Sequence, residues 1–322
     1  MKEQIINAKK LKETVNVVIG RKHYDKIFIL TDTTTRKLCL PLIDVEDSVT
    51  ITIGTSDSHK TYETLNDVLR QLVKHGASRH SLIINLGGGV VTDLGGFTAA
   101  IFKRGIDYVN IPTTLLAMVD ASVGGKTGIN FGGLKNEIGV FKAPVSVLIN
   151  TVFLKTLDNE NFLSGYAEVL KHALLDSNDL WKRTIAMINM LAPDSSNALP
   201  VNIDEHLQQL VYENVKVKTR YVDEDPLEEG IRKALNFGHT FGHAIESFSF
   251  EHPSSEVPQL SHGYAVAYGM ICELYLSTVK FGFPVEKMRQ TVSFIKENYG
   301  ALAVECKDYD RLVELMHHDK KN

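Results

Sequence analysis

Three side chains in the C-terminal half of the chain could together hold a metal ion. Glu168, His239 and His262 lie far apart in the sequence, each in a segment with a helical pattern. One carboxylate and two imidazoles form a common catalytic zinc site, which leaves a coordination position open. Each residue alone has a simpler interpretation: Glu168 can pair with Lys171 on a helix surface, and a histidine at a helix start can be a cap. Together with the glycine-rich segments upstream, they predict a metal site.

Two of those glycine-rich segments, in the N-terminal half, are suited to a phosphorylated ligand. GGGVVTD at 87–93 directly follows a predicted strand, and a helix that starts there offers unpaired N–H groups to a pyrophosphate, although a tight turn is the alternative. SVGGKTGIN at 122–130 leads into a predicted loop with Lys126, Lys135 and Asn136, whose N–H groups and ammonium ions suit a phosphate. Neither segment has G-x-G-x-x-G or G-x-x-x-x-G-K-[ST] spacing, so an NTPase is not expected.

The spacing of the histidines excludes zinc peptidases. His239 and His243 are an i,i+4 pair on one predicted helical face, as in H-E-x-x-H. Residue 240 is threonine, so the glutamate base of a peptidase is missing.

The first 155 residues alternate short β-branched runs with helical patterns. An apolar stripe that starts at Tyr62 predicts a helix with a stop at Gly76. Strands that alternate with helices predict a parallel, Rossmann-like sheet with ligands bound past the carboxyl ends of the strands. The predicted strands are Val15–Ile19, Lys26–Thr31, Val49–Ile53, Ser81–Leu86, Tyr108–Ile111 and Val145–Ile149.

Helical patterns replace the strands after about residue 155. We therefore expect an NAD-binding α/β domain at 1–155 and an all-helical metal- and substrate-binding domain at 156–322. Residues 192–203 and 251–261 are expected to be loops. The predicted helices cover 160–175, 178–191, 204–223, 231–249, 262–281, 285–299 and 308–317.

Composition narrows the class of protein. The 35 basic and 39 acidic residues give a net charge of −4, which argues against nucleic acid or an anionic membrane as a partner. No apolar run approaches the length of a membrane span, and the N-terminus lacks the apolar stretch of a signal peptide. The three cysteines are scattered, so buried thiols are expected rather than disulfides. A cytoplasmic protein is the expectation.

Long ordered blocks of the chain, from about residue 26 to its end, resemble the 3-dehydroquinate synthase family of sugar phosphate cyclases. That resemblance implies conversion of 3-deoxy-D-arabino-heptulosonate 7-phosphate to 3-dehydroquinate and phosphate, a step of the shikimate pathway. It also implies transient oxidation by NAD, phosphate elimination, re-reduction and intramolecular aldol closure, with Zn²⁺ or Co²⁺ in a homodimer. The blocks are GGGVVTDLGGF, KRGIDYVNIPTTLLAMVDASVGGKTGIN, LKNEIG, YAEVLKHAL, LNFGHTFGHAIE, SHGYAVAYGM and HDKKN, with the Lys218–Arg232 spacing.

The resemblance assigns a role to each matching position. Glu168, His239 and His262 are the implied metal ligands, and Arg104 is implied to reach into the site of a second subunit. The implied catalytic and substrate-binding residues are Asp120, Lys126, Lys171, His243, Lys135, Asn136, Lys218, Arg232 and Asn236, with a further phosphate contact at Lys320 or Lys321. The implied NAD-binding residues are Asp32, Asp57, Lys60, Gly88, Gly89, Val90, Asp93, Thr113, Thr114, Asp120, Lys126, Lys135, Thr156 and Leu157.

Two positions depart from the family pattern, and three other functions compete. Tyr264 stands where the family usually has glutamate, and Asp57 stands where glutamate usually meets the adenosine ribose. A glycerol-type dehydrogenase would not need Lys218 and Arg232 around a phosphate. A cyclase for sedoheptulose 7-phosphate or glucose 6-phosphate would not need cations for a carboxylate. A non-catalytic NAD-binding protein would have lost residues such as Glu168, which is present.

Overall fold

The computed structural model describes residues 3–191, 204–251, 259–302 and 304–317. The chain forms two compact units. The first comprises Met1–Leu157 and Ser196–Thr219, and the second comprises Asp158–Ser195 and Arg220–Asn322. The helix α7 (Asp204–Glu224) therefore contributes to both units. The division of roles between a domain at 1–155 and one at 156–322 stays a prediction.

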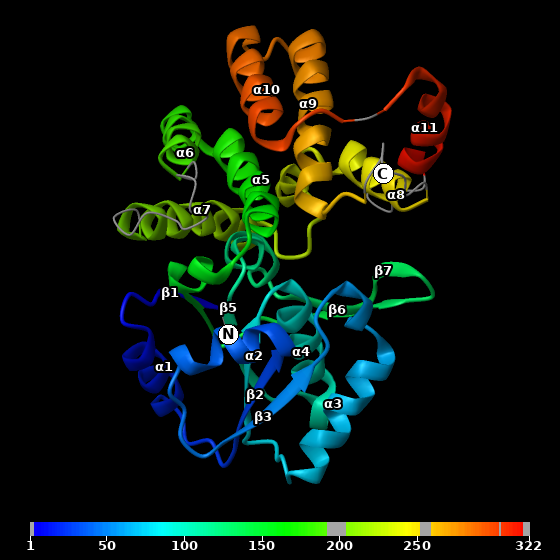
Figure 1. Cartoon of the computed structure of the whole chain (residues 1–322). Coiled ribbons are helices and arrows are strands. Elements are labelled where there is room, and N and C mark those ends of the chain that lie inside the picture. Colours follow the sequence, from blue (N-terminus) through cyan, green and yellow to red (C-terminus); the bar gives the residue numbers. More distant parts are fainter. Residues whose placement is uncertain (1–2, 192–203, 252–258, 303, 318–322) are drawn as a thin grey trace. The chain divides into compact units, whose positions relative to one another are not determined.

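A six-stranded sheet lies at the centre of the first unit (Figure 1). Its strand order is β1-β8-β5-β4-β2-β3, and all five neighbouring pairs are parallel. The chain leaves β3 at one edge and re-enters beside β2 as β4, which makes the border between β2 and β4 the point where the strand order reverses. The strands are β1 (Gln4–Asn7), β2 (Ile27–Asp32), β3 (Ser48–Ile53), β4 (Leu82–Gly87), β5 (Asp107–Pro112) and β8 (Ser146–Ile149).

Five of the six predicted strands are confirmed, and β2, β4, β5 and β8 are mostly buried, as expected for strands covered on both faces. All six residues of β4 are buried, for example. The predicted strand Val15–Ile19 is wrong, since it lies in α1 (Leu11–Gly20). Leu11, Val15 and Val18 are buried at helical spacing, and this stripe outweighs the β-branched composition. The edge strand β1 was not predicted, because four residues carry little periodicity.

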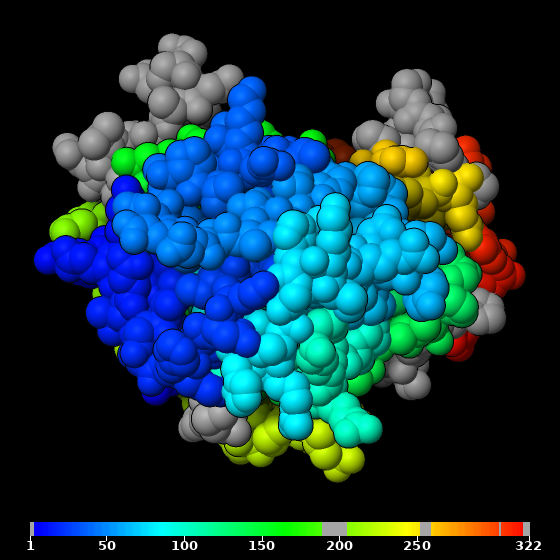
Figure 2. Space-filling view, turned by 90° about the horizontal axis from the view of Figure 1, so that it is seen from below, coloured from blue at the N-terminus to red at the C-terminus, as the bar shows by residue number. Residues whose placement is uncertain are grey.

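Helices pack around this sheet. They are α2 (Thr33–Leu38), α3 (Tyr62–Lys74) and α4 (Gly89–Ile101), besides α1. The predicted helix from Tyr62 is confirmed, and Gly76 follows its end with φ +70°, which a glycine adopts without a steric cost. Side chains of β2, β3, β4 and α3 meet in one apolar core that includes Phe28, Leu30 and Leu72. Over this core, the segments coloured blue to cyan form a continuous outer surface (Figure 2).

The glycine-rich segment after residue 122 contains a hairpin rather than the predicted loop. Strands β6 (Lys126–Phe131) and β7 (Leu134–Phe141) pair antiparallel. Gly132 and Gly133 connect them with φ of +60° and +79°, the backbone that a two-residue hairpin turn requires.

The described part of the second unit is helical (Figure 1). Its helices are α5 (Asn159–Asp176), α6 (Asn178–Leu191), α8 (His239–Glu251), α9 (His262–Phe281), α10 (Val285–Tyr299) and α11 (Tyr309–His317), besides the end of α7.

One predicted helix of this unit, 231–249, is wrong as a single element. It is divided into a 3₁₀ helix (Ile231–Asn236) and α8, because Gly238 has a left-handed backbone with φ +81°. The predicted loop 192–203 and most of the loop 251–261 lie outside the described residues. Among the helices of the described ranges, none combines the length and the apolar character that a membrane crossing requires.

Candidate active site

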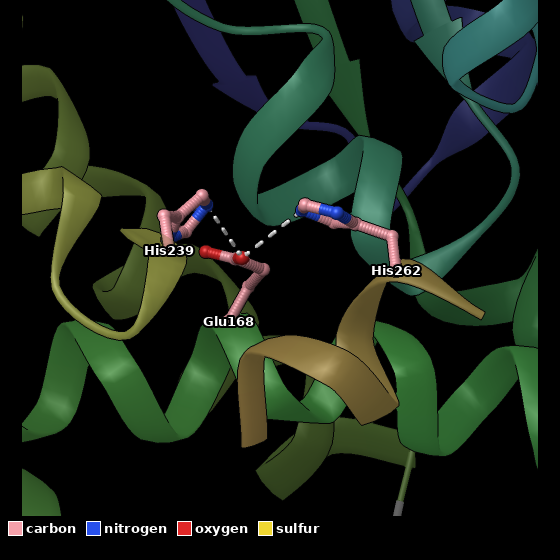
Figure 3. A group of neighbouring side chains, drawn as sticks. All are labelled: Glu168, His239 and His262. Atoms are coloured by element: carbon pink, nitrogen blue, oxygen red, sulfur yellow. Dashed lines mark ion pairs between the residues drawn. The ribbon is translucent and has the colours of Figure 1, made fainter. Parts of the chain in front are cut away.

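Glu168, His239 and His262, called here the Glu–His–His group, meet in the second unit as predicted (Figure 3). Glu168 comes from the middle of α5, His239 is the first residue of α8 and His262 is the first residue of α9. The two imidazoles lie on either side of the carboxylate (Figure 3). Their Nε2 atoms are 3.5 Å and 3.8 Å from the same oxygen, Oε1 of Glu168. Glu168 is fully buried, and its Oε1 receives no hydrogen bond from the described residues.

Close helix crossings bring this group together. The amide of Gly263 donates to Oγ of Ser164 at 3.1 Å, one helical turn before Glu168. A Cβ on Gly263 would lie 1.9 Å from the carbonyl oxygen of Ser164, so only glycine allows α9 to approach α5 this closely. A Cβ on Gly269 would lie 2.0 Å from the carbonyl oxygen of Gly238, which directly precedes His239. These glycines therefore fix the places of both histidines.

The Nδ1 atom of each imidazole has a partner that orients the ring. Nδ1 of His239 is 3.1 Å from the carbonyl oxygen of Phe237, and Nδ1 of His262 is 3.3 Å from Oε2 of Glu246. When Nδ1–H donates to these oxygens, Nε2 keeps its lone pair and faces Glu168. This arrangement is usual for histidines that bind a metal, because the outer partner fixes the tautomer.

The residues present fit a metal ion. A tetrahedral zinc ion with ligands at about 2.0–2.1 Å separates those ligands by about 3.3–3.5 Å. The two Nε2–Oε1 distances of 3.5 and 3.8 Å come close to this range before any adjustment. The carboxylate and the two imidazoles also match the ligand set of catalytic zinc sites.

Lys171 pairs with the other oxygen of the same carboxylate, Oε2 of Glu168. The sequence alternative of a surface ion pair is wrong, because the side chains of Lys171 and Glu168 are 1% and 0% exposed. A buried carboxylate needs such a compensating charge. The pair leaves Oε1 to face the histidines.

Three other predicted residues of the second unit, His243, Arg232 and Asn236, each contact a residue close to them in the sequence. The ring of His243 lies one helical turn from His239, with centroids 5.3 Å apart. Arg232 is 1% exposed, and its Nη1 donates to the carbonyl oxygen of Pro226 at 2.7 Å. Asn236 donates to Glu228 at 3.1 Å. Lys320 and Lys321 lie outside the described residues.

Seven of the fourteen predicted NAD residues lie at or after the carboxyl ends of parallel strands in the first unit. We call these positions the strand-end group. Asp32 ends β2, Gly88 and Gly89 follow β4, Thr113 and Thr114 follow β5, and Thr156 and Leu157 come after β8. This edge, at a reversal of strand order, is where open parallel sheets bind nucleotides.

Local hydrogen bonds already organise the strand-end group. Oδ1 of Asp32 accepts from the amides of Thr34 and Thr35 at 2.8 and 2.9 Å and so caps α2. Oγ1 of Thr114 accepts from the amide of Ala117 at 3.2 Å. Gly88 caps α4, in whose first turn Val90 lies. The N-terminus of this helix offers N–H groups to an anion.

Cys39 is a buried thiol at the end of α2, the helix that Asp32 caps. Burial raises the pKa of this thiol to about 11. Cys39 is therefore an uncharged packing residue. The expectation of three buried thiols is confirmed for Cys39 only, since Cys272 is half-buried and Cys306 is exposed.

Several predicted residues that carry charge pair within the first unit. Nζ of Lys218 donates to Oδ1 of Asp120 at 2.5 Å, and Asp120 lies in a π-helical turn at Ala117–Ala121. Nζ of Lys60 donates to Oδ2 of Asp93 at 2.6 Å. Burial raises the pKa of Asp93, and the neighbouring Lys60 partly offsets that rise.

The hairpin and the strained turn before β5 carry the remaining predicted residues of the first unit. Lys126 begins β6, and Lys135 and Asn136 lie in β7. The exposed Arg104 and its neighbour Lys103 have φ of +68° and +48°.

The two residues that depart from the family pattern, Tyr264 and Asp57, each contact another side chain. Tyr264 packs edge-to-face on Tyr299, with ring centroids 5.0 Å apart, and burial raises the pKa of its phenol. Asp57 accepts a hydrogen bond from Asn130 at 2.9 Å.

Sequence reasoning missed Glu228 and Glu246. Glu246 follows His239 by seven residues, which is two turns of one helix face, and this spacing was the available signal. Glu228 lies in a loop with φ +62°, and no spacing rule points to Asn236 as its partner.

Comparison with known proteins shows the family of the chain. The N-terminal domain model of 3-dehydroquinate synthase matches residues 50–164, and the C-terminal one matches 165–322. A 3-dehydroquinate synthase from Parabacteroides distasonis is 48% identical over 99% of this chain and 88% of its own length.

Two solved structures share the fold. A 2-deoxy-scyllo-inosose synthase, crystallised with carbaglucose-6-phosphate, NAD⁺ and Co²⁺, has a TM-score of 0.80 at 21% identity, over 99% of this chain and 86% of its own. The 2-epi-5-epi-valiolone synthase of Streptomyces hygroscopicus, with NAD⁺ and Zn²⁺ bound, has a TM-score of 0.80 at 23% identity, over 98% and 86%. On the family matches and the 48% relative, the chain belongs to the 3-dehydroquinate synthase family.

Proposed function

We propose that this protein is a 3-dehydroquinate synthase, which converts 3-deoxy-D-arabino-heptulosonate 7-phosphate to 3-dehydroquinate and phosphate. The observation that carries the proposal is the Glu–His–His group in a chain of this family. The reaction eliminates phosphate without net redox change, since the substrate is oxidised and reduced once within a turnover. Its place in the shikimate pathway and in the cytoplasm is part of the proposal.

The Glu–His–His group is assigned to Zn²⁺, or alternatively Co²⁺, and the strand-end group to NAD. When bound, the metal supplies a Lewis acid for the substrate's hydroxyl oxygens and NAD supplies the hydride acceptor and donor. Glu168 fits the role of a metal ligand because its buried Oε1 faces the Nε2 atoms of His239 and His262. The strand-end group fits NAD because it combines parallel strand ends with the N-terminus of α4.

The cations are assigned to the anionic substrate, which carries a phosphate and a carboxylate. Arg232 is buried and held by a backbone carbonyl oxygen, so its planar guanidinium is oriented in advance. The ammonium of Lys218 donates to Asp120, and we infer that it donates to the substrate when the substrate is bound. Lys126, Lys135, Asn136 and Asn236 are the further proposed substrate contacts.

The proton transfers are assigned to groups beside the reacting carbons. His243 lies next to the metal ligand His239 on one helix face, where an imidazole can accept or return a proton near neutral pH. Asp120 and Lys171 are the other proposed groups. The buried Lys171 also neutralises the carboxylate of Glu168.

A homodimer with a shared site is the proposed assembly. Lys103, Arg104 and Gly105 have positive φ in succession, and such strain is often kept where a backbone must present a side chain. Mixing an Arg104→Ala variant with a Lys126→Ala variant should restore part of the activity. Activity that stays absent in the mixture would contradict a site shared across the dimer.

The test of the function is a simultaneous assay of phosphate release and absorbance at 340 nm with Zn²⁺ and a catalytic amount of NAD. We expect one phosphate per substrate with no accumulating NADH, and loss of phosphate release after chelation. NADH that accumulates without phosphate would instead indicate a polyol dehydrogenase. Use of sedoheptulose 7-phosphate or glucose 6-phosphate in preference would indicate another cyclase.

A further inference from the structure

Asn130 stands at the centre of a ring of hydrogen bonds within the first unit. Its Nδ2 donates to Oδ2 of Asp57 at 2.9 Å, and its Oδ1 accepts from the amide of Asn136 at 3.0 Å. Its own amide donates to the carbonyl oxygen of Lys60 at 2.8 Å. The ring closes because Nζ of Lys60 donates to Oδ1 of Asn136 at 2.5 Å. One side chain therefore ties the turn at Asp57–His59 to the hairpin β6–β7.

The backbone at both ends of this ring is strained. Ser56, directly before Asp57, has φ +95° and ψ 162°, a region that is essentially reserved for glycine. Asn136 has φ +53°, the left-handed region that asparagine tolerates better than most residues. Strained backbone persists only where neighbouring contacts hold it. The two hydrogen bonds of the Asn130 side chain are such contacts.

We propose that the pair Asp57–Asn130 positions Asn136, and that Asp57 serves this purpose in place of a direct contact with the adenosine ribose. Asp57 is one methylene shorter than the glutamate usual at this position, and its Oδ2 is already engaged by Asn130. Asn130 is a positioning residue, since it acts through Asn136. The inference rests on the proposed function for the role of Asn136 at the substrate.

An exchange of the two side chains tests the pair. In Asn130→Asp the donor is lost and two carboxylates face each other, so the hairpin should loosen. Asp57→Asn should be mild, because an amide oxygen still accepts from Asn130. In the double variant the side-chain amide introduced at position 57 can donate to the carboxylate introduced at position 130. The other oxygen of that carboxylate still accepts from the backbone amide of Asn136.

Steady-state kinetics and NAD titration give the first readout. We expect Asn130→Asp to raise KM for the heptulosonate phosphate about three- to tenfold, the size of one hydrogen bond. The double variant should return KM to within about twofold of the wild-type value. The Kd of NAD, titrated calorimetrically without substrate, should change less than about twofold in all variants. Weaker NAD binding in Asp57→Asn, without rescue in the double variant, would overturn the proposal and make Asp57 a cofactor ligand.

Hydrogen exchange of the hairpin gives a second readout that needs no activity. Asn130→Asp should speed amide exchange in Lys126–Phe141, and the double variant should slow it again. If exchange is rescued but the wild-type protein releases no phosphate, the positioning pair stands and the proposed function fails. If Asn130→Asp leaves exchange in the hairpin unchanged, the positioning role itself is contradicted.

Discussion

The strand-end group and the Glu–His–His group are assembled in different ways: the first from residues at strand ends, the second from three helices. In the strand-end group, the residues lie at or after the carboxyl ends of strands, and Oδ1 of Asp32 accepts from two amides of the helix that it caps, although Oγ1 of Thr113 has no hydrogen-bond partner among the described residues. In the Glu–His–His group, three helices must approach closely, and Oε1 of Glu168 faces the Nε2 atoms of two histidines. We propose that a bound metal ion completes the Glu–His–His group.

This difference has an energetic consequence. A buried carboxylate oxygen without a hydrogen bond is costly, and Lys171 pairs with Oε2 of Glu168 and not with Oε1. Binding of a metal to the folded chain supplies the missing interaction and stabilises that state by mass action. We therefore expect metal removal to lower the melting temperature more than NAD removal does.

The largest effect should come from His239→Ala. Loss of one of three protein ligands should remove the metal and bring turnover to background, because a catalytic site depends on all its ligands. The Kd of NAD should stay within about twofold, since the strand-end group lies in the other unit. Phosphate release and calorimetric NAD titration measure the two. A parallel loss of NAD affinity would contradict the independence of the strand-end group from the Glu–His–His group.

Glu246→Ala should have the next largest effect. Without Oε2 at 3.3 Å from Nδ1, the imidazole of His262 loses its orientation, and metal affinity should fall about 10- to 100-fold. The control is Glu246→Gln, whose amide oxygen can still accept from Nδ1–H, and its loss should be smaller. Competition with a coloured chelator measures the affinities. Equal affinities in both variants and wild type would show that Glu246 does not orient the ring.

A matched pair of alanine substitutions, one in each group's surroundings, tests whether only the Glu–His–His group depends on a close approach of helices. Gly263→Ala should cost about 1–3 kcal/mol of unfolding free energy and weaken metal binding, because its Cβ meets backbone at 1.9 Å. Gly88→Ala should cost much less, because its Cβ would lie 3.1 Å from a methyl group of Thr114 that can shift slightly. Urea denaturation compares the two variants. Similar losses at both glycines would contradict the close-crossing account.

The smallest effect should follow Asp32→Ala. Loss of this N-cap should cost about 1 kcal/mol of stability and weaken NAD binding without changing metal affinity. Denaturation and the two titrations check the three quantities. A change in metal affinity would mean that the two groups are coupled.

Sequence reasoning went furthest where chemistry follows directly from a strand end. The glycines after β4 and the threonines after β5 were found because a short apolar run and its next residues are adjacent in the chain. The sequence predicts a loop where the structure has a hairpin, because a glycine-rich segment does not show the strand pattern of Lys126–Phe131 and Leu134–Phe141. The strand predicted at Val15–Ile19 failed because β-branched composition was weighed above helical spacing.

Contacts between distant segments were harder to predict. Glu168, His239 and His262 were identified as possible ligands from residue type and family resemblance, but their distances depend on glycine crossings such as Gly263 with Ser164. Glu246 was missed because its seven-residue spacing from His239 does not show that it faces His262. The partner of Asp57 was missed for the same reason, since Asn130 lies 73 residues away.

The most direct test of the account is the metal content of the protein after equilibrium dialysis against Co²⁺ without NAD. We predict one ion per chain in the wild type, with the visible absorption of a low-coordinate cobalt site, and none above background in Glu168→Gln. Cobalt that remains bound to Glu168→Gln with an unchanged spectrum would contradict the assignment of the Glu–His–His group as the metal site.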